Sequence, residues 1–175
     1  MRLLLAMSTV AAGLGASTLE LLSTNDLIAK STAIVRARVT AEPSGFLHRG
    51  MIYSRYRLAV LETRKGPNAA TLDVAVPGGV ISGLRQTVAG APGLRANEEY
   101  VFFLWTSRTG LTQIIGLTQG LFAVKAGGSG AVMLSRGPAS EPVVDPATGR
   151  RVEDKGLEWP LEDLKRRLRA EAAKQ

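Results

Sequence analysis

Apolar and polar side chains alternate along several short segments of this chain, and turn-forming residues interrupt the alternation at close intervals. The clearest case is STAIVRARVTAEP. One side of this segment carries Ala33, Val35, Ala37 and Val39, and the other carries Ile34, Arg36, Arg38 and Thr40. A period of two residues is typical of a strand with one buried face. The strand is expected to end at Pro43, Ser44 and Gly45.

Two further segments repeat this pattern, and a third lacks it. IYSRYRLAVLETRKG places Tyr56, Leu58 and Val60 on one face, and TLDVAVPGG does the same with Leu72, Val74 and Val76. EYVFFLWT is continuously apolar, which predicts a central strand buried on both faces. Shorter strands are expected at residues 85–88 and in LTQIIGL, GLFAVKA and AVML. Strands at this spacing, with turns between them, indicate a small barrel or a sandwich.

Helical patterns stand at both ends of the strand-rich region. In LELLSTNDLIAKS, Ser23 followed by Asp26 has the outline of a capping box, which predicts a short helix. WPLEDLKRRLRAEAAKQ predicts a C-terminal helix with Pro160 in its first turn. Its leucine stripe is expected to pack on the strands. The alternative is peripheral contact with a membrane surface, which this stripe favours less because it lacks Trp and Phe.

The amino terminus has the outline of a signal peptide. Met1 and Arg2 precede LLLAMSTVAAGLGA, an apolar stretch that ends on small residues and is too short to span a bilayer comfortably. A core helix at the start of a domain is the other interpretation. We predict a signal peptide over residues 1–16 and a mature chain that begins near Ala16 or Ser17. The protein is then exported, to the periplasm or the extracellular space.

The glycine-rich stretch VAVPGGVISG raises the question of a phosphate-binding loop. Such a loop leads into a helix N-terminus and carries a lysine and a serine or threonine in register. The residues that follow, GLRQTVAG, offer neither the helix nor the lysine. We therefore interpret these glycines as a sharp change of strand direction.

The sequence excludes most catalytic chemistries. It contains no cysteine and one histidine, His48, so disulfides, thiolate sites and cysteine nucleophiles are absent, and a zinc site or a triad would depend on that one imidazole. His48 is expected on a surface loop. Glu98 and Glu99 are neighbours in a strand and point to opposite faces, so they cannot share a proton. We predict a protein that is not an enzyme and has no cofactor or metal.

Arginines at alternate positions of two predicted strands form the candidate binding site: Arg36, Arg38, Arg55 and Arg57. If the strands pair with these arginines on one face, the guanidinium groups would favour carboxylates or phosphates. The other interpretation is a solvated strand face that discourages aggregation. The formal charge of +7 agrees with an anionic partner and equally with simple solubility. A nucleic acid is the less favoured partner, because the chain is expected to be exported and is only 5% aromatic.

The order of elements in DLIAKSTAIVRARV, YRLAVLETRKG, LDVAVPGG, GAPGLRANEEYVFFLW and GLTQGLFAV resembles a group of exported bacterial β-barrel proteins of unassigned role. The same region, Leu22 to Ala126, is more distantly similar to netrin-like modules and tissue inhibitors of metalloproteinases. This resemblance implies an OB-type barrel with flanking helices. Those inhibitors act through an N-terminal cysteine, which this chain lacks, so their activity does not carry over.

Together these observations predict a mainly β fold: a small OB-like barrel with a short N-terminal helix and a C-terminal amphipathic helix. The barrel domain is expected over residues 17–135, a turn-rich connection over 136–158 and the packed helix over 159–175. The predicted function is an exported, non-enzymatic binding module whose ligand is an anionic polymer or a protein. The alternative is a structural or assembly component of the cell envelope, which docks a partner through the helix or a strand edge.

Overall fold

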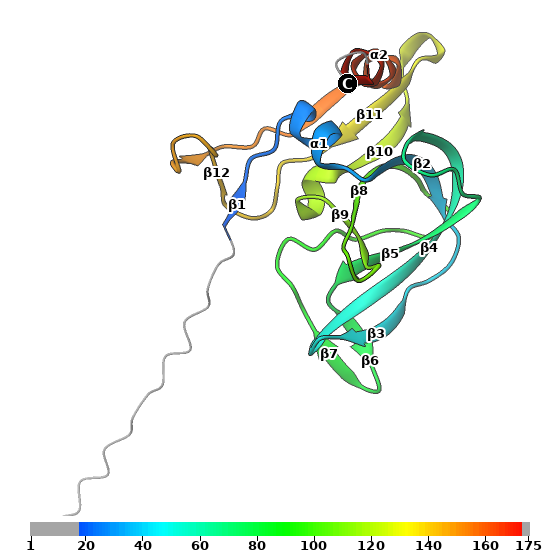
Figure 1. Ribbon diagram of the computed structural model, residues 1–175, viewed down its shortest axis with the longest axis vertical. Coiled ribbons are helices and arrows are strands. Elements are labelled where there is room, and N and C mark those ends of the chain that lie inside the picture. Colours follow the sequence, from blue (N-terminus) through cyan, green and yellow to red (C-terminus); the bar gives the residue numbers. More distant parts are fainter. Residues whose placement is uncertain (1–17, 173–175) are drawn as a thin grey trace, which may run out of the picture.

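The structure, a computed structural model, describes residues 18–172. The expected signal peptide, residues 1–16, lies outside the described residues. The fold is mainly β, as predicted, with two α-helices in the described range, α1 (Thr24–Lys30) and α2 (Leu161–Ala172). Neither helix is long and apolar enough to cross a membrane. Figure 1 shows α2 at one end of the molecule and β3, β6 and β7 at the opposite end.

The strands follow one another in chain order with short connections, two of them 3-10 turns, η1 (Leu117–Gly120) and η2 (Gly128–Gly130). They are β1 (Leu19–Glu20), β2 (Ala33–Val39), β3 (Ser44–His48), β4 (Met51–Lys65), β5 (Thr71–Pro77), β6 (Gly79–Ile81), β7 (Leu84–Gln86), β8 (Glu99–Thr106), β9 (Thr112–Ile114), β10 (Leu121–Ala126), β11 (Val132–Arg136), β12 (Val143–Val144), β13 (Arg151–Val152) and β14 (Leu157–Pro160).

The main sheet has the order β14-β11-β10-β8-β2-β4-β3, with β5 also paired to β4 and β9 to β8. The long strand β4 organises one half of it. Its residues 51–55 pair with β3 and residues 58–65 with β2, while β5 pairs with residues 53–59 along the opposite edge. Two register shifts between β2 and β4 bend this half of the sheet.

The sheet does not close into the expected barrel. The strands β5 and β9 are the two ends that a five-stranded barrel β9-β8-β2-β4-β5 would join, and each pairs with a single strand of the described chain. β9 has only three residues, which leaves little length for a second ladder, and none of them pairs with β5.

The first hydrophobic core fills the concave side of this curved sheet and confirms the predicted alternation. Its buried members include the following residues of β2, β4 and β5: Ala33, Val35, Ala37, Val39, Tyr56, Leu58, Val74 and Val76. Val60 and Leu72 pack against it. Each burial removes apolar surface from water, at about 25 cal/mol per Å².

A second core lies on the opposite face of β8. Val101 and Phe103 belong to it, whereas Tyr100, Phe102 and Leu104 belong to the first core. The prediction of a strand buried on both faces is therefore confirmed. Ile34 was expected on the solvated side of its strand with Arg36, but it is fully buried in this second core. The reason is that α1 and α2 cover this part of the sheet with leucines.

Both helices begin close to their predicted starts. The capping box of α1 is present: Ser23 Oγ accepts from the Asp26 amide at 3.1 Å, and the Ser23 amide donates to Asp26 Oδ2 at 3.0 Å. The C-terminal helix begins at Leu161 rather than at residue 159, because Leu157–Pro160 form β14 and pair with β11. Pro160 is thus the last residue of a strand. Leu161 and Leu164 are buried, as the leucine stripe predicted.

The glycines after β5 turn the chain into a hairpin and not into a helix. Gly78 and Gly79 have φ values of 90° and 142°, and the strands that follow are β6 and β7, paired as a hairpin. The backbone amides of this stretch therefore do not lie at a helix N-terminus, and the interpretation as a corner is confirmed.

We predict that Gly45→Ala destabilises the fold by about 1–3 kcal/mol, the range for overpacking a tight site. A Cβ atom at this position would lie 1.8 Å from the backbone oxygen of Val80, in β6. Chemical denaturation monitored by tryptophan fluorescence measures the change. Gly93→Ala is the matched control, because nothing lies within 4 Å of its added Cβ and it should leave stability within about 0.5 kcal/mol. Equal stabilities for the two variants would contradict the close approach of β3 and β6.

Candidate functional site

The four candidate arginines lie on the outer face of the curved sheet. Arg38 pairs with Ala59 of β4, so their side chains point to the same side. Arg57 precedes Ala59 by two residues and shares its face, and so does Arg55. The opposite side of these strands faces the first core. The structure therefore brings all four arginines to one face, the condition on which the predicted site depended. We call this surface the arginine face.

Two of these arginines share one carboxylate. Arg36 donates from Nε and Nη2 to Glu99 Oε2, at 3.1 and 2.7 Å, and Arg38 Nη2 donates to Glu99 Oε1 at 2.5 Å. Hydrogen bonds from Arg38, then Arg36, lower the pKa of Glu99 below its usual value. Glu99 is therefore ionised at neutral pH and neutralises part of the positive charge of this pair.

A second carboxylate holds Arg57. Its Nε donates to Asp73 Oδ1 at 3.0 Å, directly across from it on β5. The hydrogen bond from Arg57 lowers the pKa of Asp73. The side chains of this ion pair are 65% and 41% exposed, so water competes for both partners and the pair contributes little to stability.

Arg55 is the member of the arginine face that forms no ion pair within residues 18–172. Its guanidinium carbon lies 4.6 Å from the centre of the Phe46 ring, a cation–π contact, and its charge also acts on Asp73, whose pKa it helps to lower. Phe46 in turn stacks on Tyr53, with ring centroids 5.7 Å apart. Phe46 and Arg55 line a hollow of about 350 Å³, at the seam where β5 and the residues leading into β9 approach without pairing.

The arginine face keeps an excess of positive charge. Glu99 and Asp73 are two carboxylates against four guanidinium groups, and Glu62, opposite Arg36, is engaged by Arg64. Solvated guanidinium groups with planar donors can form paired hydrogen bonds with external carboxylates, sulfates or phosphates.

Sequence reasoning missed Glu99 and Asp73 as members of this site. Glu99 was considered only together with Glu98, and the structure confirms that these neighbours separate: Glu98 accepts from the Tyr100 hydroxyl at 2.6 Å. The missing signal was register, since Arg38 lies opposite Glu99 and Arg57 opposite Asp73.

His48 is the last residue of β3 rather than part of a loop, and its ring meets the edge of Tyr53 at 6.2 Å.

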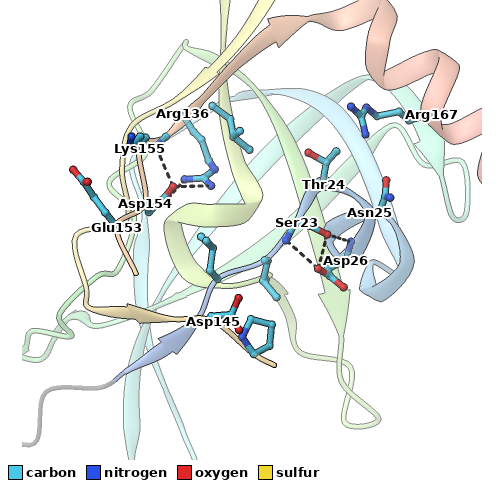
Figure 2. A pocket seen from close by; sticks show the side chains of 15 residues that line it. Ser23, Thr24, Asn25, Asp26, Arg136, Asp145, Glu153, Asp154, Lys155 and Arg167 are labelled. Atoms are coloured by element: carbon cyan, nitrogen blue, oxygen red, sulfur yellow. Dashed lines mark hydrogen bonds and ion pairs between the residues drawn. The ribbon is translucent and has the colours of Figure 1, made fainter. Parts of the chain in front are cut away.

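A larger cleft, of about 620 Å³, lies on the other side of the molecule's core, between the start of α1, residues 145–157 and Arg167 of α2. Figure 2 shows Arg136 joined to Asp154 on one wall and Ser23 joined to Asp26 on another. The carboxylate of Asp154 accepts from Arg136 Nη1 at 2.6 Å and from the amides of Ala139 and Gly156 at 2.8 and 3.0 Å. This ion pair joins the last residue of β11 to the segment just before β14.

Two carboxylates of this cleft, those of Asp154 and Asp26, stabilise the fold. Burial by itself would raise the pKa of Asp154, but the hydrogen bonds from Arg136 and the two amides lower it. The hydrogen bonds from Ser23 lower the pKa of Asp26, whose carboxylate caps α1. Both carboxylates are thus ionised at neutral pH and held by donors. Across residues 18–172, no group of three or more His, Asp or Glu side chains is placed to hold a metal ion.

The chain was compared with family models, with curated proteins and with solved structures, and none of the three comparisons found a match.

We predict that Asp154→Ala lowers the free energy of unfolding at neutral pH by about 3–5 kcal/mol, because it leaves the guanidinium of Arg136 buried without its counter-charge. The two side chains are 3% and 5% exposed. Denaturant titration measures the loss, and Glu153→Ala, an exposed carboxylate next in the chain, is the control with little effect.

The same pair gives a pH dependence. Because the pKa of Asp154 is lowered in the folded state, its contribution is complete above the unfolded value of about 3.9 and is lost as the pH falls through the folded value. The stability of the native protein should therefore fall more steeply below about pH 4 than that of Asp154→Ala. Parallel pH profiles would show that the pair does not stabilise the fold.

Proposed function

We propose that this protein is an exported, non-enzymatic binding module whose arginine face contacts an anionic partner. The observation that carries the proposal is the placement of Arg36, Arg38, Arg55 and Arg57 on one outer sheet face with only Glu99 and Asp73 paired to them. Such a face attracts anions and retains donors for them. The apolar start of the chain, MRLLLAMSTVAAGLGA, supports export.

The distribution of acidic residues supports the same proposal. The sequence contains no Asp or Glu from residue 43 to residue 61, or from residue 74 to residue 97. These stretches form β3, most of β4 and the β6–β7 hairpin, and they carry five arginines: Arg49, Arg55, Arg57, Arg85 and Arg95. Arg57 and Arg95 pair with Asp73 and Glu98, whereas Arg49, Arg55 and Arg85 form no ion pair within residues 18–172 and lie on the two hairpins at the end of the molecule opposite α2 (Figure 1).

The architecture we propose for this module is an OB-like sheet left open at the seam between β5 and β9. The strand path β9-β8-β2-β4-β5 around the first core supports it. In this arrangement the seam, with Phe46 and Arg55 beside it, is a solvent-open part of the arginine face.

A structural or assembly role in the cell envelope is the second candidate. The strand β3 favours it, because within the described residues β3 pairs only with β4 and ends the main sheet. An edge of this kind can accept a strand from a partner. The C-terminal helix offers less for docking, since Leu161 and Leu164 are already buried against the sheet.

We predict salt-dependent binding to a soluble polyanion. Dextran sulfate, titrated in a fluorescence or calorimetric assay, should bind with an affinity that falls linearly with the logarithm of salt concentration, as counterion release requires. Arg55→Gln and Arg38→Gln should each weaken binding and reduce the salt slope by about one. Arg150→Gln, an exposed arginine in the turn before β13, is the control that should change neither. Binding that is independent of salt would contradict the proposal.

We further predict that Glu99→Gln strengthens binding to the same polyanion. The substitution keeps the shape of the side chain and removes the charge that Arg36 and Arg38 share. The gain should be about two- to five-fold at low salt, the equivalent of an exposed ion pair. Glu158→Gln, an exposed carboxylate on β14, is the matched control and should leave affinity unchanged. A loss of affinity would show that Glu99 positions the arginines and does not compete with the ligand.

A further inference from the structure

Four large apolar side chains are exposed at the end of the molecule opposite α2. Leu47 is 62%, Met51 37%, Val80 44% and Leu84 68% exposed. They come from two separate hairpins, β3–β4 and β6–β7, and Figure 1 shows both hairpins at this end. We call these four residues, with the two turns beside them, the hairpin tip. Leu47 and Met51 lie on opposite faces of the β3–β4 hairpin, and Val80 and Leu84 lie on opposite faces of the β6–β7 hairpin, so the four side chains surround the tip and do not form one flat patch. Large apolar side chains exposed around one end of a molecule indicate a surface that makes contact end-on.

The two hairpins form one rigid unit. The backbones of β3 and β6 touch at Gly45 and Val80, where a Cβ atom would be 1.8 Å from an oxygen. Across the unit, the Ile52 amide donates to Gln86 Oε1 at 2.7 Å, and Ser54 Oγ donates to the Gly78 oxygen at 2.9 Å. The apolar side chains are therefore held in place before any partner arrives, which reduces the entropy lost on binding.

Both turns are tight and project their neighbours outward. The turn of the first hairpin has positive φ at Arg49 and Gly50, 49° and 81°, and that of the second at Ser82 and Gly83, 48° and 79°. Two positive φ values in succession are typical of the type I′ turn that joins two strands most directly. Short turns leave no flexible loop to fold back over the apolar side chains.

Cationic groups surround the hairpin tip, and acidic groups are absent from its two hairpins. Arg49 lies in the first turn, Arg85 pairs with Val80, and Arg55 follows on the same face of β4 as Met51. The sequence has no Asp or Glu between residues 43 and 61 or between 74 and 97. Exposed apolar side chains at the tip, with guanidinium groups on the same two hairpins, complement a surface that is apolar inside and negatively charged outside.

From this arrangement we propose that the hairpin tip docks on an anionic lipid bilayer. The proposal rests on the proposed function and names the anionic partner as a membrane surface. Leu47, Met51, Val80 and Leu84 enter the boundary between headgroups and acyl chains, while Arg49, Arg55 and Arg85 contact lipid phosphates. The arginine face behind the tip then lies near the membrane, where its remaining charge adds attraction that salt screens.

The apolar side chains favour a bilayer over a soluble polyanion as the partner. A polyanion binds guanidinium groups and gains little from exposed leucines, whereas a membrane takes up both. A protein partner would have to supply both an apolar surface and carboxylates in the geometry of the tip. A bilayer presents an apolar interior and anionic headgroups whatever the rotation of the protein about the membrane normal.

Sedimentation with vesicles tests this proposal. The full chain should bind vesicles of phosphatidylcholine with about one third phosphatidylglycerol, and should bind phosphatidylcholine vesicles at least about ten-fold more weakly. The double variant Leu47→Ser/Leu84→Ser should lose about ten-fold or more in affinity for the anionic vesicles, because each leucine loses its burial in the bilayer. Leu61→Ser, which removes another exposed leucine (47% exposed) from β4 outside the tip, is the matched control and should bind as the native protein does.

A reporter at the tip gives a second measurement that does not depend on affinity. In Leu84→Trp, anionic vesicles should shift the emission of the new tryptophan to the blue, and dextran sulfate should not. No shift with vesicles that do bind would show that a different surface makes the contact and would overturn the proposal.

Dextran sulfate distinguishes failure of this proposal from failure of the proposed function. Native protein that binds dextran sulfate but not anionic vesicles would overturn the membrane proposal and leave the anionic-partner function in place. Binding to neither would overturn both. The double serine variant should keep its affinity for dextran sulfate and its native circular dichroism spectrum. A folded variant that loses affinity for dextran sulfate would show that the leucines do not act through a bilayer and would overturn the proposal.

Discussion

The two-sided burial of β8 is the constraint on which the rest of this structure depends. Phe102 and Leu104 pack into the core on the concave side of the sheet, and Val101 and Phe103 pack under α1, α2 and the C-terminal strands. β8 thus contributes its large apolar side chains to both cores, and β2 joins it at Ile34. Because every residue of its centre is inside, β8 cannot slip by one position without moving a phenylalanine from one core into the other. Its register then fixes β2 and, through β2, the long strand β4.

The register that follows from this packing also determines the surface. Along β2, the side facing away from the first core begins at Ile34, which is buried under the helices, and continues to Arg36 and Arg38, whose side chains are 28% and 50% exposed. The boundary between covered sheet and arginine face therefore lies within one strand. Where the helices end, the outer face must carry polar groups, and the chain uses arginines balanced in part by carboxylates of the neighbouring strands. The binding face we propose is the part of the sheet that the helices leave uncovered.

The sequence predicted the strands and their buried faces better than it predicted how the strands join. The alternation in β2, β4 and β5 identified the inward side chains correctly, because burial on one face imposes a period of two whatever lies on the other. The strand β3 was missed, since Pro43, Ser44 and Gly45 are typical of a turn; here Gly45 lies within β3 because the backbone of β6 passes directly against it. Closure of the barrel, the pairing of β14 with β11, and the partners Glu99 and Asp73 all depend on register, which a single sequence does not encode locally.

The exposure of the ion pairs on the arginine face explains how this surface can be stable and still bind an external anion. Four guanidinium groups on one face without counter-charges would repel one another and destabilise the fold. Glu99 and Asp73 relieve that repulsion. The Arg57–Asp73 pair is well exposed, so exchanging its carboxylate for an external anion costs little, whereas Glu99 is 21% exposed and held by two arginines. The buried pair of Arg136 and Asp154 shows the opposite design: desolvated and held by backbone amides, it cannot be exchanged without opening the fold. The chain thus uses the same two side-chain types in two ways, and the exposure of the pair decides which one is available to a ligand.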